Sequence, residues 1–264
     1  HSCSGWFDTD GLFIIATGRK MWETGILHTH PFSVLAGMHT IIQQWLWCLN
    51  VSTLYDTLGR WGMFLLILLC QLVLALLFYA YLKDEGGRNN LFVFSLCLIM
   101  VILNPFISIR PEIITLILLT AQWLCLKKYI SSGKPCLLDI IPLLVLAEIN
   151  FHASYWILHF ILLLPYVIPS LIPKIFPRDG ISLSALKKHC VHYIFVFLLS
   201  VGALFLNPYG KDGIAYVFLS LKANISVLPI KELNNTQFFS LFGAALLVTF
   251  TLFVISIIKK KLSG

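Results

Sequence analysis

Two carboxylates separated by one residue, Asp8 and Asp10, are the groups near the start of the chain whose type and spacing could do chemistry. A carboxylate beside a partly dry surface can take a proton from an acceptor hydroxyl. A carboxylate pair can instead hold a divalent cation through hard oxygen ligands. The structural alternative is a solvated loop, or an N-cap for the helix predicted to follow.

Other polar residues stand at the ends of apolar runs on the side of the chain that Asp8 and Asp10 occupy. They are Arg110, Glu112, Glu148, Asn150, His152, Asn207 and Tyr209. Arg110 could bind a lipid-linked phosphate bidentately; its alternatives are a snorkelling side chain or an ion pair with Glu112 or Glu148. Ionisable groups at membrane depth are costly and usually functional, so we expect these side chains to line a polar cavity, with a buried structural network as the alternative.

The composition indicates a membrane protein. The chain of 264 residues is 58% hydrophobic and 12% charged, whereas a soluble domain carries about a quarter charged residues. The net charge of +7 does not indicate nucleic-acid binding, because the basic residues lie in short loops without interleaved aromatic residues. The seven cysteines show no metal-type spacing, and His28, His30 and His39 fit no closed zinc pattern.

The apolar runs predict an all-α, polytopic helical bundle of about seven transmembrane spans. The predicted spans are 61–82, 91–107, 112–126, 137–149, 155–172, 192–206 and 238–258. Residues 1–60 are predicted to form a large outer loop that precedes the transmembrane domain of residues 61–264. Within that loop we expect a helix over 12–24 that ends at Gly25, and an amphipathic, Trp-bearing helix over 38–55 that lies at the membrane interface.

The basic residues predict the orientation. If residues 1–60 are outside, the inner segments 83–90, 127–136, 173–190 and 259–264 hold 12 of the 19 lysines and arginines: Lys83, Arg88, Lys127, Lys128, Lys134, Lys174, Arg178, Lys187, Lys188, Lys259, Lys260 and Lys261. Positive charge favours the inner side of a membrane. The same arrangement places Asp8, Asp10, Arg110, Glu112 and Glu148 on the outer side.

Several motifs together resemble bacterial integral membrane proteins related to the GT-C superfamily of glycosyltransferases. They are Asp8-x-Asp10 with 15–19, Gly25 with Pro31-Phe32-Ser33, Gln44-Trp45-Leu46, Arg110-Pro111, Asn150-x-His152 and Asn207-Pro208-Tyr209-Gly210. The resemblance implies a GT-C-like bundle with juxtamembrane helices in its first outer loop, in the bacterial plasma membrane. The chain departs from the family pattern at His30 and Gln44, where an acidic residue is common.

The resemblance also implies an activity, which is sugar transfer from a polyprenyl-phosphate donor to an acceptor on the outer face. Asp8 or Asp10 would match the acidic residue that serves as base or as ligand of Mg²⁺ or Mn²⁺, and Arg110 would bind the donor phosphate. Members carry a helix before the acidic pair and further chain after the last span, so we expect a piece of a longer protein. The alternatives are a transporter or lipid flippase, and an assembly protein without chemistry.

Overall fold

The computed structural model describes residues 9–34, 37–84, 109–171 and 183–222. The chain forms two compact units, His1–Phe218 and Leu219–Gly264, and nearly all described residues belong to the first. The described residues are mostly helical, and no strand occurs among them beyond an isolated bridge between Thr29 and His39. The all-α prediction is thus confirmed. The predicted spans 91–107 and 238–258 lie outside the described residues.

The first helix follows the prediction. α1 covers Thr9–Thr24 and ends where Gly25 adopts a φ of 82°, a left-handed conformation that glycine adopts without steric cost. The Gly25 N–H donates to the Met21 carbonyl at 2.9 Å, which closes the last turn. α1 buries Ile14, Ile15 and Met21 on one face.

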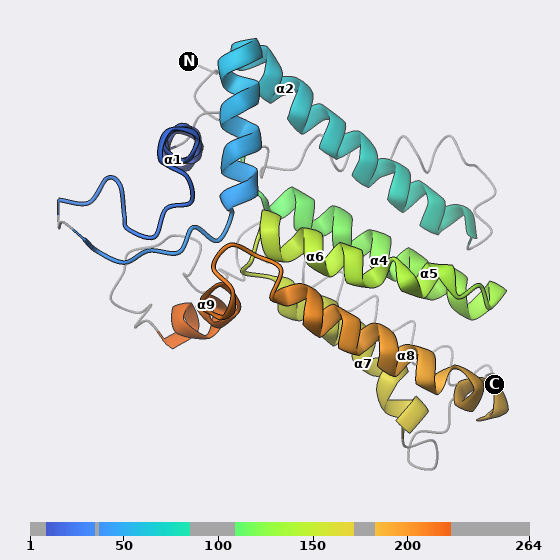
Figure 1. Cartoon of the computed structure of the whole chain (residues 1–264). Helices are drawn as coiled ribbons and strands as arrows, with labels where there is room; N and C mark the ends of the chain where they lie inside the picture. Colours follow the sequence, from blue (N-terminus) through green and yellow to red (C-terminus); the bar gives the residue numbers. More distant parts are fainter. Residues whose placement is uncertain (1–8, 35–36, 85–108, 172–182, 223–264) are drawn as a thin grey trace, which may run out of the picture. The chain divides into compact units, whose positions relative to one another are not determined.

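The second helix differs from the prediction. α2 runs from Trp45 to Asp84 with one interruption, at Gly59, whose φ is 58° and ψ is −141°. The surface helix expected over 38–55 therefore begins only at Trp45, and it joins the span expected over 61–82 through a single residue. Figure 1 shows the two limbs of α2 meeting at a sharp bend. Residues 38–44 remain non-helical because they continue the bridged loop, in which the Thr40 N–H donates to the His28 carbonyl at 3.0 Å.

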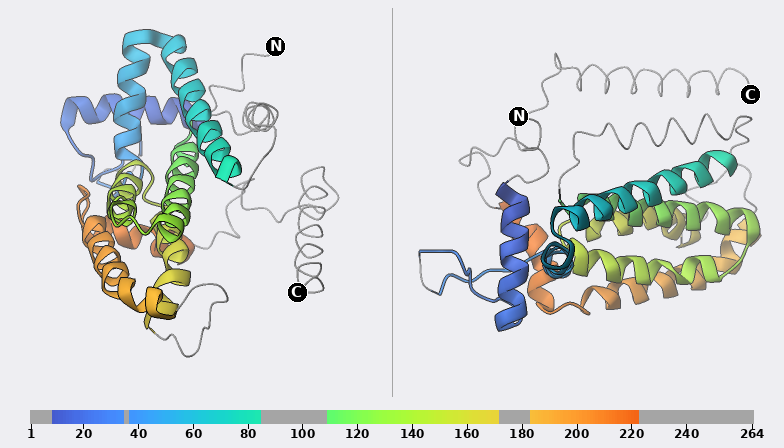
Figure 2. Two further views of the ribbon diagram at one scale, coloured as in Figure 1. Left: turned by 90° about the vertical axis from the view of Figure 1, so that its right-hand side faces the viewer. Right: turned by 90° about the horizontal axis from the view of Figure 1, so that it is seen from above.

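The described helices that follow belong to the first unit, except for residues 219–222 of the last one. They are α4 (Glu112–Ser132), α5 (Cys136–Asp139), α6 (Ile141–Phe151), α7 (Trp156–Leu171), α8 (Leu183–Leu204) and α9 (Lys211–Lys222). α4 contacts α2 and α6, and α8 contacts α6 and α7, an arrangement that Figures 1 and 2 show as helices running side by side. A buried cluster that includes Val145, Leu163 and Val196 joins α6, α7 and α8.

Two of these helices are long and apolar enough to cross a membrane, namely Trp45–Tyr81 and Glu112–Ser132. Only 33% and 28% of their apolar windows are buried, whereas a core helix of a soluble protein would be mostly buried. In the second limb of α2, Leu65 and Leu69 are more than half exposed. Shorter apolar helices cover Trp156–Val167 and Val191–Leu204. The described residues thus contain two helices that could cross a membrane, which overlap the predicted spans 61–82 and 112–126. The predicted span 137–149 is wrong as a single helix, because α5 ends at Asp139 and α6 begins at Ile141.

Candidate functional site

Asp10 and Arg110 form an ion pair. Asp10 lies in the first turn of α1, and Arg110 lies two residues before the first residue of α4. The Arg110 Nη2 is 2.7 Å from the Asp10 Oδ2, and the side chains are 26% and 57% exposed. The structure thus places two of the predicted site residues, 100 positions apart in the sequence, in direct contact. Asp8 lies outside the described residues.

Trp47 and Ile109 hold Arg110 in place. The Trp47 Nε1–H donates to the Ile109 carbonyl at 3.1 Å, and both side chains are almost completely buried. This hydrogen bond fastens the residue before Arg110 to the first limb of α2. Since α1 packs on that same limb, α2 is the common support that brings Asp10 and Arg110 together.

α1 approaches α2 very closely at Gly18. A Cβ atom on Gly18 would lie 2.0 Å from the Cys48 carbonyl oxygen and 2.5 Å from the Ser52 Oγ. Only a glycine at this position permits the two backbones to come so near each other. The approach carries Asp10, two helical turns earlier on α1, to the end of α4.

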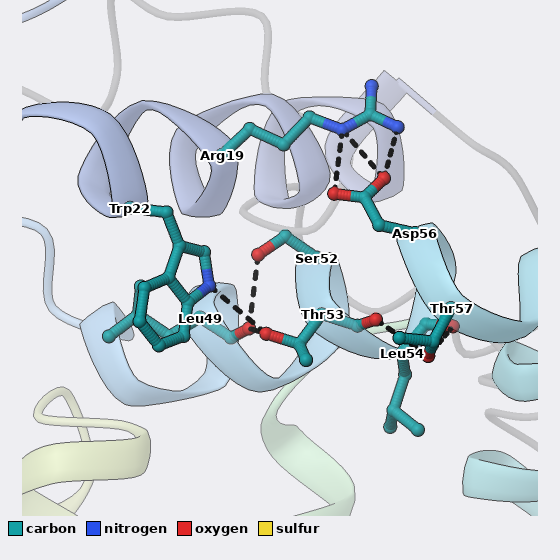
Figure 3. Close-up of polar contacts among 8 residues, drawn as sticks. All are labelled: Arg19, Trp22, Leu49, Ser52, Thr53, Leu54, Asp56 and Thr57. Atoms are coloured by element: carbon teal, nitrogen blue, oxygen red, sulfur yellow. Dashed lines mark hydrogen bonds and ion pairs between the residues drawn. The ribbon is translucent and has the colours of Figure 1, made fainter.

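Two side-chain contacts secure the crossing of α1 over α2 (Figure 3). The Arg19 Nε donates to both Asp56 carboxylate oxygens, at 2.9 Å and 3.2 Å, and the Trp22 Nε1–H donates to the Thr53 Oγ1 at 3.0 Å. The Arg19 guanidinium lowers the pKa of the Asp56 carboxyl through its hydrogen bond. Arg19–Asp56 is therefore a second Arg–Asp pair on α1, about half exposed and distinct from Asp10–Arg110.

A buried polar network continues from the ends of α4 and α6 into the bundle. The Thr115 hydroxyl donates to the Glu148 Oε1 at 2.7 Å, and its oxygen lies 3.0 Å from the His152 Nδ1. Because Thr115 has only one hydroxyl proton, His152 donates through Nδ1–H. Glu148, Thr115 and His152 are all buried. These residues form a closed network rather than lining an open cavity.

The network extends to His159 of α7. The Gln122 Nε2 donates to the His159 carbonyl at 2.8 Å, which directs the Gln122 Oε1 to the His159 Nδ1. His159 Nε2 then faces the Glu148 Oε2 at 3.6 Å, and neither of these two buried atoms has another hydrogen-bond partner.

The sequence analysis did not identify Thr115 and His159 as polar members of the bundle. Both lie inside apolar runs and both are buried. An ionisable residue within an apolar run is costly unless a partner compensates it. The position of His159 in such a run is therefore the feature of the sequence that indicates a buried polar partner. Gln122 also lies within an apolar run, and its pairing with His159 depends on packing between distant segments.

Burial gives His152 a pH-dependent effect on stability, since it lowers the pKa of the imidazole to about 4. An unfolded histidine binds a proton below about pH 6.5, so unfolding takes up a proton between pH 6.5 and pH 4. We expect the free energy of unfolding to fall by roughly 3 kcal/mol as the pH is lowered from 6.5 to 4. Thermal unfolding in detergent at a series of pH values measures this loss.

The matched control for this pH experiment is His39, which is exposed. His152→Gln should flatten the pH dependence of the unfolding free energy, whereas His39→Gln should leave it as in the parent chain. Equal slopes for His152→Gln and the parent chain would contradict the assignment.

Three other predicted site residues, Asn150, Asn207 and Tyr209, make hydrogen bonds within the fold. The Asn150 Oδ1 accepts from the Trp45 Nε1–H at 3.1 Å, and its Nδ2 donates to the Leu206 carbonyl at 3.0 Å; Asn150 thus joins the ends of α2, α6 and α8. The Asn207 side chain is used within its own turn, where its Oδ1 accepts from the Tyr209 N–H at 2.8 Å. The Tyr209 hydroxyl donates to the Leu27 carbonyl at 2.9 Å.

The remaining predicted site residue, Glu112, lies in the first turn of α4, two positions after Arg110. The described residues thus separate into an exposed ion pair, Asp10–Arg110, and a buried network around Glu148. The ring of His152, with its centroid 4.7 Å from that of Tyr155, lies at the outer edge of this network.

The side chains that the structure describes do not provide a set of ligands for a metal ion. These residues contain no group of three or more His, Cys, Asp or Glu side chains that could hold one. The Asp10 carboxylate contacts a guanidinium, whose charge repels a divalent cation. The expected Mg²⁺ or Mn²⁺ stays a prediction, because Asp8 belongs to that expectation.

Comparison with protein-family models, with curated proteins and with solved structures yields no match to this chain. The resemblance to the GT-C superfamily therefore stays a prediction from the sequence motifs.

Proposed function

We propose that the chain is a membrane glycosyltransferase that moves a sugar from a polyprenyl-phosphate donor to an acceptor hydroxyl, on the outer face of a bacterial plasma membrane. The observation that supports this proposal is the 2.7 Å contact between Asp10 and Arg110. It brings a carboxylate and a guanidinium together at the helix ends, half open to solvent, next to a helix long enough to cross a membrane.

The two groups have complementary roles in the transfer. The acceptor oxygen attacks C1 of the sugar, the bond between C1 and the phosphate oxygen breaks, and its electron pair leaves with the polyprenyl phosphate. The acceptor proton passes to the Asp10 carboxylate, which acts as general base. The Arg110 guanidinium stabilises the negative charge that develops on the leaving phosphate. Attack opposite the phosphate inverts the configuration at C1.

The resting ion pair prepares both groups for this step. The Arg110 guanidinium positions the Asp10 carboxylate that acts as the base. When a donor phosphate takes Arg110 as its partner, the Asp10 carboxylate is released to accept a hydrogen bond from the acceptor. The ion pair is thus an exchangeable contact, consistent with the partial exposure of both side chains.

Transfer by the chain reconstituted in phospholipid vesicles tests the proposal. A panel of radiolabelled polyprenyl-phosphate sugars is added, and the release of polyprenyl phosphate is measured by chromatography. Asp10→Asn and Arg110→Gln should each lower the rate at least about 100-fold, the usual effect of removing a general base or a charge-stabilising donor. Asp56→Asn and Arg19→Gln, which remove the other Arg–Asp pair of α1, are the matched controls and should retain activity.

Unchanged transfer by Asp10→Asn would overturn the proposed role of this carboxylate. Equal losses in the Asp10→Asn and Asp56→Asn variants would indicate that α1 needs its ion pairs for folding, with no special role for Asp10. The absence of transfer from every donor in the panel, with a correctly folded chain, would count against the transferase class.

One observation favours transport as a second candidate function. Gln122, Glu148 and His159 are fully buried and form a polar chain across α4, α6 and α7, where a transporter places its polar groups. The same vesicles distinguish the two functions, because a flippase exposes fluorescent inner-leaflet lipid to an external reductant. Loss of such exposure in Glu148→Gln, but not in Asp10→Asn, would support transport over sugar transfer.

A further inference from the structure

A cavity of about 420 Å³ opens between α2, α4 and α7, away from the Asp10–Arg110 pair. Phe78 and Tyr81 of α2, Leu119 and Trp123 of α4, and Ile161 of α7 contribute to its lining. The volume lies within the roughly 300–1,000 Å³ of pockets that hold small molecules. Since nearly all of the lining is apolar, the cavity fits a hydrocarbon chain better than a sugar or a nucleotide.

The cavity lies beside the middle of α4, a helix long enough to cross a bilayer. α4 has 21 residues and is about 32 Å long, close to the roughly 30 Å of the hydrocarbon core. Leu119 and Trp123 lie near the middle of α4, while Phe78 and Tyr81 lie in the last turns of α2. The lining residues of α2, α4 and α7 each cover about one helical turn, or about 6 Å, one turn before Lys127 of α4, so the cavity holds a segment of an acyl chain.

Positive charge stands at the surface end of the cavity. The Lys127 Nζ lies 4.4 Å from the centroid of the Tyr81 ring and 3.5 Å from the Tyr81 carbonyl oxygen. Lys83 and Lys128 are exposed in the last turns of α2 and α4. Asp84 and Glu85 follow Lys83 in the sequence, so Lys127, over the Tyr81 ring, is the positive group that the geometry places at the cavity. An ammonium group within reach of a phosphate, above an apolar cavity, matches the two parts of a lipid.

We propose that this cavity is a binding site for an anionic phospholipid. One acyl chain fills the space between α2, α4 and α7, and the headgroup phosphate contacts the Lys127 ammonium. The inference does not depend on the proposed transfer, because the lipid is a resident of the leaflet at the ends of α2 and α4 and undergoes no reaction. A chain bound here would hold α2, α4 and α7 together.

Trp123 makes the proposal measurable, because it lines the cavity and brominated acyl chains quench tryptophan fluorescence on contact. The full chain is reconstituted in phosphatidylcholine vesicles that contain equal fractions of brominated phosphatidylglycerol or brominated phosphatidylcholine. We expect phosphatidylglycerol to quench at least about twofold more. Trp123→Phe should abolish that difference, whereas Trp61→Phe, which removes a 75% exposed tryptophan far along α2 from the cavity, should preserve it.

The charge requirement is tested with two lysine variants on α4. Lys127→Gln should remove the preference for phosphatidylglycerol. Lys128→Gln makes the same change of charge on a neighbouring residue that does not line the cavity or contact Tyr81, and it should keep the preference. Circular dichroism establishes that each variant is folded, and Thr120→Phe, which fills the cavity from α4, should reduce quenching of Trp123 by both lipids.

Equal quenching of the parent chain by the two brominated lipids would overturn the proposal, because the cavity would then hold any lipid. A preference that survives Lys127→Gln would overturn the headgroup assignment. Displacement of brominated phosphatidylglycerol by a polyprenyl phosphate, but not by unbrominated phosphatidylglycerol, would assign the cavity to a different lipid.

Discussion

The double variant Asp10→Arg with Arg110→Asp is expected to fold like the parent chain and to transfer sugar at least about 1,000-fold more slowly. The exchange rebuilds an ion pair between α1 and the start of α4, where Arg110 and Asp10 now meet at 2.7 Å. It also moves the base to the position of the phosphate-binding group, and the loss combines the effects of a missing general base and a misplaced cation. Thermal unfolding and the vesicle transfer assay measure the two outcomes separately.

The single variants provide the internal reference for this exchange. Asp10→Arg alone places two guanidinium groups side by side, and Arg110→Asp alone places two carboxylates side by side, so each should be less stable than the double variant. A double variant that regains both stability and transfer would show that the pair is structural, and the proposed catalytic roles would be wrong.

Gly18→Ala is expected to destabilise the chain by about 3 kcal/mol, the upper part of the range for overpacking, because the added methyl group cannot be accommodated. The added Cβ atom would lie 2.0 Å from the Cys48 carbonyl oxygen. Because this oxygen belongs to the backbone of a helix, it cannot rotate away as a flexible side chain can. α1 must therefore move off α2, which breaks the Arg19–Asp56 and Trp22–Thr53 contacts. Chemical or thermal unfolding in detergent measures the loss.

Gly202 of α8 supplies the matched control for Gly18→Ala. A Cβ atom there has no neighbour within 4 Å, and alanine favours the helix over glycine by about 1 kcal/mol. Gly202→Ala should thus leave stability unchanged or raise it. If Gly18→Ala and Gly202→Ala gave the same unfolding temperature, the close approach of α1 to Cys48 would not exist in the native chain.

Local features of the fold were predictable from the sequence. Gly25 ended the predicted helix at 24, and the structure ends α1 at Thr24, because a glycine that can adopt a positive φ is a local signal. The continuity of α2 was not predictable, since Gly59 separates two patterns that read as different elements. The interruption of α2 is confined to Gly59, so the residues on either side keep helical spacing.

The sequence indicated some of the polar residues that contact one another in the structure, but it did not indicate how they pair. The ends of apolar runs identified Asp10, Arg110 and Glu148 as polar groups on one side. Which of them meet depends on long-range packing, and the sequence offered Glu112 or Glu148 as the ion partner of Arg110. The partner in the structure is Asp10, because the Gly18 crossing and the Trp47–Ile109 hydrogen bond are contacts between distant segments.

The bend at Gly59 has a consequence for the depth of the site in the bilayer. With a φ of 58° and a ψ of −141°, this residue has a backbone conformation that is open almost exclusively to glycine. The first limb of α2 carries α1 and holds Arg110 through Trp47, while the second limb is the apolar span. In the proposed membrane arrangement, the height of Asp10 above the hydrocarbon is therefore set by the two backbone torsions of Gly59. A change in these torsions would tilt α1 and the first limb of α2 relative to the second limb. In that arrangement, the Asp10 carboxylate would reach a different layer of the headgroup region while its contact with Arg110 is kept.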